Sequence, residues 1–283
     1  MSDFKAVFNK HDLSELFVIS PPVRTLTAWE PTMVESVIGS VPTGTKPQPM
    51  EITLDLTTFA ATPQARLEAL RTLSSWLAVD EPRPLVLTDE VLGRVQVGGS
   101  GGTWKDVYAL RDAFPTGAPN VTPALNASTA RVKFVCPDPR AYLADANFFP
   151  TGSATEINDS KQTRLVWLSS SEQVTANFTG TAPTKPVFHF VGLYGGPNGY
   201  FHFSVGFVEG NNFVWHPISI AAASDASLTV RVDFEARTLT IGTTNVVDMS
   251  LEWFNVDPNK TCSFRVESGG FSSGSVSYYP RWW

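Results

Sequence analysis

The sequence predicts a mainly β protein with one α-helix, divided into two domains. Leucines recur at helical spacing over residues 63–78, whereas short apolar or alternating segments between Pro, Gly and Asn turns fill most of the remaining chain. The composition changes after Pro137-Asp138-Pro139, beyond which no convincing helix is predicted. A chain of 283 residues also suits two domains. We therefore expect domains at 1–143 and 144–283.

The first domain is expected to hold strands on both sides of the helix. Residues 51–56 and 131–136 alternate between apolar and polar side chains, which is typical of half-buried strands. The inward positions would be Ile52, Leu54, Leu56, Val132, Phe134 and Cys136. Further strands are expected at 16–19, 33–38, 84–88, 94–97 and 104–110.

The helix has a clear start, face and end in the sequence. Thr62 is a suitable N-cap, and Pro63 suits the first helical position, where a missing N–H costs little. Pro82 and Pro84 prevent the helix from continuing. The expected core stripe is Leu67, Leu70, Leu73 and Leu77, with Arg66, Glu68 and Arg71 elsewhere on the cylinder.

The second domain is expected to be an antiparallel sandwich of short strands. The expected strands are 164–168, 174–178, 187–191, 200–207, 213–220, 228–234, 238–241, 263–266 and 275–279. In the segment 228–234, Val230 and Val232 would face the core, and Arg231 and Asp233 would face away. The chain has no fixed-period repeat, which argues against a solenoid or propeller.

Charge and cysteine content exclude several classes of protein. The net charge is -6 without any basic run, so sequence-independent nucleic-acid binding is not expected. The two cysteines, Cys136 and Cys262, lie in alternating apolar patterns and are expected to be buried free thiols, although a disulfide between them is an alternative. We expect no secretory signal, because the first residues lack an apolar core, and no membrane span, because no long apolar stretch occurs.

The order of several segments resembles the distal tail protein family of siphoviruses, the phages with long non-contractile tails. In the first half, a strand and the leucine-rich helix precede Pro-Leu-Val-Leu-Thr-Asp at 84–89 and an aromatic strand around Tyr108. This half closes with Arg-Val-Lys-Phe-Val-Cys-Pro-Asp-Pro-Arg-Ala-Tyr at 131–142. In the second half, the resemblance rests on residues 178–187, 232–241 and 276–282, and it thus covers most of the chain.

The resemblance implies a structural protein rather than an enzyme. The N-terminal half would be a β-sandwich-like ring (belt) domain, and the C-terminal half a galectin-like β-sandwich. A homo-oligomer, expected to be a hexameric ring, would join the tail tube protein to the tail-tip (tail-associated) protein and the tape-measure protein. DNA would pass through its channel without specific binding, which the acidic balance suits. The protein would assemble in the host cytoplasm and reside at the virion tail tip, without cofactors and without inserting into a membrane.

Motifs that suggest catalysis are better explained by structure. Gly98-Gly99-Ser100-Gly101-Gly102 matches the pattern of a nucleophile elbow, but a strand is expected after it where that motif needs a helix. His189 and His202 would need a third ligand to bind a metal, although they could face each other across a hairpin. The acidic pairs at 80–81 and 89–90 are interpreted as solvated loop residues. We therefore predict no catalytic, cofactor-binding or metal-binding residue.

Sugar binding is the alternative function. In that case the chain would be a carbohydrate-binding module that adheres to host cell-wall polysaccharide, and a wall hydrolase would be the third possibility. Trp215, His216 and Trp253 are weak candidates for the ligand site, because aromatic faces stack on sugar rings. A galectin-type His-x-Asn-x-Arg set is absent, and Pro217 follows His216 directly. The sequence therefore favours a passive second domain over a tight sugar site.

Overall fold

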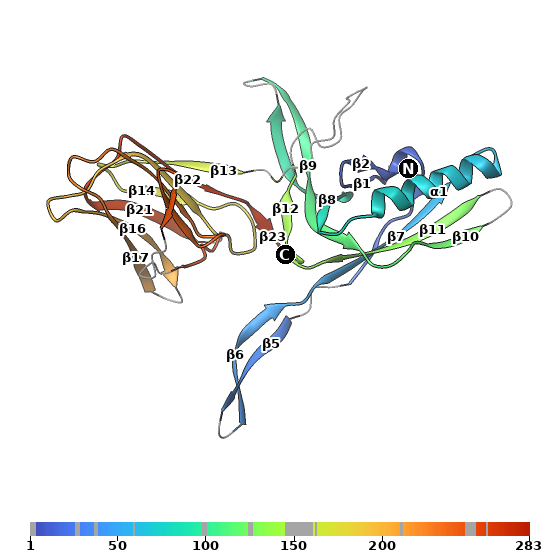
Figure 1. The fold of residues 1–283 in the computed structure, drawn as a ribbon, viewed down its shortest axis with the longest axis horizontal. Coiled ribbons are helices and arrows are strands. Elements are labelled where there is room, and N and C mark those ends of the chain that lie inside the picture. Colours follow the sequence, from blue (N-terminus) through green and yellow to red (C-terminus); the bar gives the residue numbers. More distant parts are fainter. Residues whose placement is uncertain are drawn as a thin grey trace. The chain divides into compact units, whose positions relative to one another are not determined.

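The chain folds into two compact units, described here from a computed structural model (Figure 1). The structure describes residues 4–25, 29–36, 39–58, 60–97, 101–123, 127–144, 161, 163–209, 212–246, 253–258 and 260–283. Unit 1 comprises Met1–Lys161 with Trp283, and unit 2 comprises Gln162–Trp282. In the described part of the chain the fold is mainly β, with several antiparallel sheets and one α-helix, as expected. The boundary at 143/144 stays a prediction.

The main sheet of unit 1 contains the predicted strands together with several additional short strands. Its neighbouring strands follow the order β2 (His11–Asp12), β1 (Ala6–Phe8), β8 (Arg83–Val97), β9 (Thr103–Pro115), β11 (Ser128–Cys136), β7 (Met50–Thr58) and β3 (Val18–Ile19). The strands β10 (Asn120–Pro123), β4 (Val23–Arg24) and β12 (Ala141–Leu143) pair with β11, β7 and β9, respectively. A short 3-10 helix, η1 (Leu13–Glu15), precedes β3, so only the end of the expected 16–19 strand forms.

The register of β7 and β11 confirms the two alternating patterns. Ile52 lies opposite Phe134, and Leu54 opposite Val132, with all four side chains in the core of unit 1. Their polar neighbours form ion pairs on the other face, Asp55 with Arg131 at 2.7 Å and Glu51 with Lys133 at 2.7 Å. The two strands therefore separate a dry face from a charged one, as period-two alternation requires.

The helix α1 (Pro63–Leu77) begins and ends as predicted, but its core stripe is shifted. The Oγ1 of Thr62 accepts a hydrogen bond from the backbone N–H of Ala65 at 3.1 Å, which confirms the N-cap. Leu67 is 42% exposed, so its predicted core position is wrong. The buried residues are Arg66, Ala69, Leu73 and Leu77.

Arg66 explains why the stripe could be misread. Its position is spaced like an apolar core residue, three residues before Ala69, and its side chain is 8% exposed on the core side. The guanidinium Nη1 donates a hydrogen bond to the carbonyl of Ala60 at 2.9 Å, so a charged residue occupies the place of an apolar one. A charged side chain with a long aliphatic stem is therefore compatible with this face.

The β8–β9 hairpin is longer than the sequence indicated. The two expected strands at 84–88 and 94–97 are one continuous strand, β8, whose register against β9 shifts between Val86 and Val91 and again between Val91 and Gly93. These irregularities accommodate the acidic pair at 89–90 without ending the strand. Most of the Gly-rich segment, residues 98–100, lies outside the described residues.

A second hairpin of unit 1 stands apart from its main sheet. The strands β5 (Trp29–Ser36) and β6 (Gly39–Pro47) pair only with each other in a two-stranded sheet, among the described strands. Figure 1 draws them as a blue hairpin leading away from β7. An isolated two-stranded hairpin is marginally stable in water, so this one has little support of its own.

Unit 2 consists of two antiparallel sheets around one core. The first sheet has the order β13 (Arg164–Leu168), β22 (Ser273–Tyr278), β15 (Val187–Leu193), β18 (Leu228–Asp233), β19 (Thr238–Ile241) and β20 (Thr244–Val246). The second has the order β14 (Val174–Asn177), β21 (Thr261–Ser268), β16 (Tyr200–Glu209) and β17 (Asn212–Ala221). A short strand, β23 (Arg281–Trp282), follows them. No helix occurs in the described part of this unit, as the sequence predicted.

Phenylalanines from both sheets fill the space between them. Phe188 and Phe190 of β15 meet Phe203 of β16 edge to face, with ring centroids 5.2 and 5.4 Å apart. Phe264 of β21 joins the same cluster. Edge-to-face pairs add specificity beyond the burial of apolar area, so this aromatic core fixes how the two sheets face each other.

Both cysteines are buried free thiols, as the alternating patterns predicted. Cys136 lies in the core of unit 1 and Cys262 in the core of unit 2. Burial raises the pKa of each thiol to about 12. No described helix is both long and apolar enough to cross a membrane.

Candidate functional site

A polar network ties β4, β8 and β9 of unit 1 together. Arg111 of β9 donates from Nη1 and Nη2 to the two carboxylate oxygens of Glu90 of β8, at 2.7 and 2.9 Å. Its Nε donates to the carbonyl of Pro139 at 3.1 Å. Arg24 of β4 contacts Asp89 at 2.6 Å and Glu90 at 3.5 Å. The network thus fixes the acidic pair within the sheet.

The electrostatics of Glu90 follow from this geometry. Burial by itself would raise the pKa of Glu90, but hydrogen bonds from Arg111 and the charges of Arg111 and Arg24 more than offset that effect. The pKa therefore lies below its ordinary value, and the group remains an anion. The expectation that the pair at 89–90 is merely solvated is wrong, because arginines hold both carboxylates.

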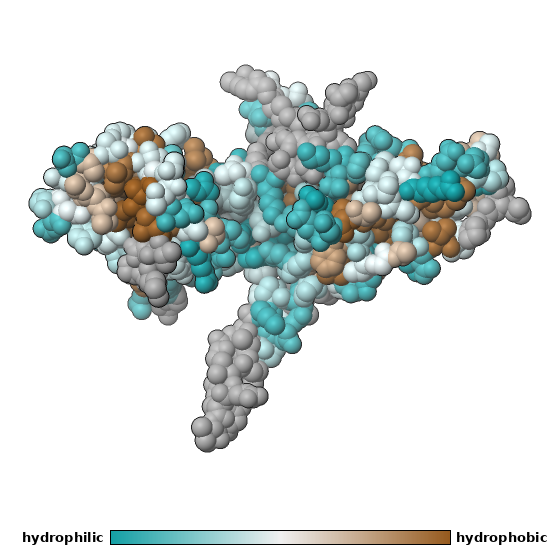
Figure 2. Space-filling model, viewed as in Figure 1, coloured by the Kyte–Doolittle hydropathy of each residue, from teal (hydrophilic) through white to brown (hydrophobic). Residues whose placement is uncertain are grey.

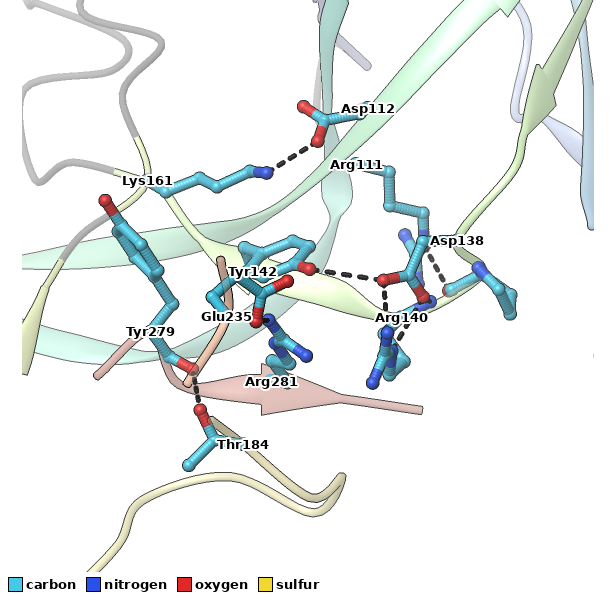
Figure 3. A network of polar contacts seen from close by, with 11 residues as sticks. Arg111, Asp112, Asp138, Arg140, Tyr142, Lys161, Thr184, Glu235, Tyr279 and Arg281 are labelled. Carbon is cyan, nitrogen blue, oxygen red and sulfur yellow. Dashed lines mark hydrogen bonds and ion pairs between the residues drawn. The ribbon is translucent and has the colours of Figure 1, made fainter. Parts of the chain in front are cut away.

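The turn that follows β11 has its own set of polar contacts (Figure 3). Asp138 accepts hydrogen bonds from the guanidinium of Arg140 at 2.7 and 2.7 Å, and from the Tyr142 hydroxyl at 3.2 Å. Burial by itself would raise the pKa of Asp138, but these contacts lower it by more. The pKa of Asp138 therefore lies below its ordinary value. The Nζ of Lys161 lies 4.1 Å from the centroid of the Tyr142 ring and donates a hydrogen bond to Oδ2 of Asp112 at 2.5 Å. The segment 131–142, which resembles the distal tail protein family, therefore ends in an ion-paired turn between β11 and β12.

In unit 2, the three aromatic candidates for a sugar site lie in different places. Trp215 and His216 are adjacent on β17 and point to opposite faces of the sheet. His216 is 6% exposed and stacks on Phe207 at 4.7 Å. Trp253 packs edge to face on Phe234 at 5.0 Å, beside the core. The structure does not bring these three side chains together, and their role stays a prediction.

Trp215 is the outward-facing member of that set, but its ring already has a partner. The guanidinium of Arg265 lies 3.9 Å from the ring centroid, within the range of a cation–π contact. On the strand beside it, a side chain at Gly206 would come within 2.7 Å of the indole, so the ring lies against that glycine. A ligand that stacked on this tryptophan would first have to displace Arg265.

The two histidines considered for a metal site belong to separate sheets. His189 lies on β15 and His202 on β16, so the expectation that they could face each other across a hairpin is wrong. The Nδ1 of His202 forms a hydrogen bond with Ser219 at 2.9 Å. Within the described ranges, no group of three or more metal-ligating side chains occurs.

Sequence reasoning missed the most exposed aromatic side chain of unit 2. Trp167 is 67% exposed on β13, and Leu165 on the same face is 51% exposed. The segment Arg-Leu-Val-Trp-Leu was predicted as a strand, and its alternation with Val166 already placed both residues on one face. The sequence did not indicate which of the two faces of this strand is exposed to solvent.

Comparisons with known proteins find a similar fold among the solved structures. No protein-family model and no curated protein sequence matches the chain. Among solved structures, the chain is similar to the SPP1 Dit (gp 19.1) protein, described as a paradigm of the hub adsorption apparatus in phages that infect Gram-positive bacteria. The identity is 13%, the TM-score is 0.61, and the match covers 98% of each chain.

A second match concerns a larger assembly. The chain is similar to a protein in the structure of the phage P2 baseplate in its activated conformation, with 10% identity, a TM-score of 0.42 and coverage of 98% and 97%. The similarity to SPP1 Dit by itself confirms the predicted distal-tail-protein resemblance at the level of the fold.

Proposed function

We propose that the protein is a structural hub of a siphophage tail, a distal tail protein without enzymatic activity. The observation that carries this proposal is the fold similarity to SPP1 Dit along 98% of both chains. Agreement over both units is more informative than agreement over one, because a sandwich alone occurs in many unrelated proteins. The resemblance in the segment order of the sequence supports the same conclusion.

In this proposal unit 1 forms a hexameric ring, and unit 2 is a galectin-like sandwich attached to it. The β5–β6 hairpin supports ring formation, because a two-stranded sheet with no further strand among the described residues gains stability by packing on a neighbour. Cyclic closure satisfies such a contact in every copy. The ion-paired network around Arg111 would keep the β8–β9 hairpin in a fixed register during assembly.

The surface is compatible with a tail component. Figure 2 shows hydrophobic residues in separate areas among hydrophilic ones on the viewed face of both units. The net charge of -6 suits a channel wall that DNA passes without binding. The partners would be the tail tube protein, the tail-tip protein and the tape-measure protein. The protein would act at the tail tip of the virion.

Native mass spectrometry of the purified protein tests the ring. We expect a closed homo-oligomer whose mass corresponds to six copies. In a matched variant a short Gly-Ser linker replaces residues 29–47, and we expect the assembly to be lost while the main sheet stays folded. A strict monomer at high protein concentration would contradict the proposal.

A further inference from the structure

The outer face of the first sheet of unit 2 carries a narrow trough with a floor of serines. On β22 the inward residues are Gly274, Val276 and Tyr278, so the serines between them face outward. The strands on both sides, β13 and β15, present larger side chains to the same face. We define the serine trough by Leu165, Trp167, Ser273, Ser275, Ser277 and His189.

The strand register sets the cross-section of the trough. Ser275 lies directly opposite Trp167 on one side and His189 on the other. Adjacent strands are about 4.8 Å apart, so the two walls stand about 10 Å from each other at the backbone. One step along β22, Ser277 lies between Leu165 and Val187 in the same way. The arrangement thus repeats along the strand.

Ser275 has an unusual environment for a hydroxyl group. It faces away from the core, yet it is only 8% exposed, because the side chains of Trp167 and His189 flank it. No hydrogen bond to its hydroxyl occurs among the described residues. Ser277, by contrast, donates weakly to the carbonyl of Val187 at 3.4 Å. The hydroxyl therefore has a narrow opening to the surface and no protein partner among the described residues, so it is available to bond a ligand.

The chemistry of the trough indicates the kind of ligand. Its walls are the exposed indole of Trp167 and the exposed imidazole of His189, and its floor consists of hydroxyls. No carboxylate or ammonium group belongs to it. Next to His189, Arg231 is hydrogen-bonded to Asp233 at 2.8 Å, so that neighbouring pair is neutral as a whole. Such a surface offers stacking and hydrogen bonds without net charge.

We infer that the serine trough binds an uncharged pyranose polymer, with a sugar ring stacked on Trp167 and its hydroxyls bonded to Ser275 and His189. A hydroxyl-rich ring matches both the apolar wall and the polar floor. The Trp215 face of the other sheet lacks this combination, because Arg265 covers its ring. The inference is independent of the proposed hub function, since a monomer contains the whole trough.

Native gels that contain a soluble polysaccharide test the inference with the full chain. The probes are a β-glucan, a galactan and a mannan, each over a range of concentrations. We expect at least one of them to retard the protein. Trp167→Ala should weaken this binding at least about tenfold, and Ser275→Ala about threefold to tenfold, the loss of one hydrogen bond. Thermal melting of both variants is expected to match the parent, which would show that they remain folded.

The control and the contrary outcomes are equally specific. Trp104→Ala removes a tryptophan of similar exposure, 60% against 67%, from unit 1 and should leave retardation unchanged within twofold. The inference is overturned if none of the three polysaccharides retards the protein, or if Trp215→Ala abolishes binding while Trp167→Ala does not. A change of oligomer mass in Trp167→Ala without any retardation of the parent would identify a protein contact instead.

Discussion

Arg111 binds both carboxylate oxygens of Glu90 from the neighbouring strand, and its side chain is only 5% exposed. Removing the arginine would leave the partly buried Glu90 carboxylate without its main partner. We expect Arg111→Met to destabilise unit 1 by about 3–5 kcal/mol, measured by urea denaturation. Arg94→Met removes an exposed partner of Asp106 and should cost less than about 1 kcal/mol.

The same pair predicts acid sensitivity. The pKa of Glu90 is lower in the folded protein than its ordinary value of 4.5. The stabilisation by Arg111 is therefore complete above pH 4.5 and is lost as the pH falls through the lower, folded-state pKa. Urea titrations between pH 7 and pH 3 should show this loss in the parent and a smaller one in Arg111→Met. If the free energy of unfolding depended on pH equally in both proteins, the Arg111–Glu90 pair would not be the source of the acid sensitivity.

The helix offers a direct test of its buried face. Leu73 is fully buried, whereas Leu67 is 42% exposed on the same helix. We expect Leu73→Ala to lower the free energy of unfolding by about 2–5 kcal/mol and Leu67→Ala by less than about 0.5 kcal/mol. Leu70 is partly buried at the edge of the core, and Leu70→Asp should lie between these limits. Similar losses at positions 67 and 73 would contradict the observed orientation.

The contrast between these leucines shows what the sequence could predict about the fold. Strand positions were predictable where polar and apolar residues alternate strictly, as in β7, β11 and β18, because period two leaves one choice of buried face. The helix face was ambiguous, because Leu67 and Arg66 are neighbours and either could border the core. Among the described strands, β5 and β6 pair with each other and not with the main sheet, and no local pattern encodes that separation.

The candidate site was less predictable than the fold for a physical reason. Trp215, His216 and Trp253 are residue types suited to sugars, but the exposure of each side chain depends on which sheet its strand joins. Ser275 and Trp167 are 108 positions apart in the sequence numbering and become neighbours only through the pairing of β13 with β22. A local pattern contains no information about that pairing, so the serine trough was not visible in the sequence.

The two units should fold separately. Each has its own cluster of buried residues, and no residue belongs to both. We expect the fragment 162–283 to fold with its aromatic core intact, measured by near-ultraviolet circular dichroism, and to unfold cooperatively on heating. Limited proteolysis of the full chain should first cut between the units, near the predicted boundary. Early cleavage within β15 or β18 would argue against an independent second unit.

The cysteines predict a simple chemical result. Burial raises the pKa of both thiols to about 12, so almost no reactive thiolate is present at pH 8. A thiol reagent such as Ellman's reagent should modify neither Cys136 nor Cys262 in the folded protein and both in guanidinium chloride. Rapid reaction of Cys136 alone would show that unit 1 opens locally.

Gly195 predicts a loss of stability that is backbone in origin. A side chain at this position would come within 1.8 Å of the backbone carbonyl oxygen of Ala222 and 3.1 Å of the backbone N of Tyr200. Because both obstacles are main chain, no rotamer change can relieve the clash, and Gly195→Ala must move the loop or the end of β17. We expect a cost of at least about 1–3 kcal/mol, seen as a lower melting temperature of unit 2.

Gly199 in the same loop provides the matched control. Its φ is +75°, and no atom lies near an added Cβ. Asparagine tolerates that backbone conformation, so Gly199→Asn should melt close to the parent. If Gly195→Ala melted with the control, the close approach of the two segments would be wrong.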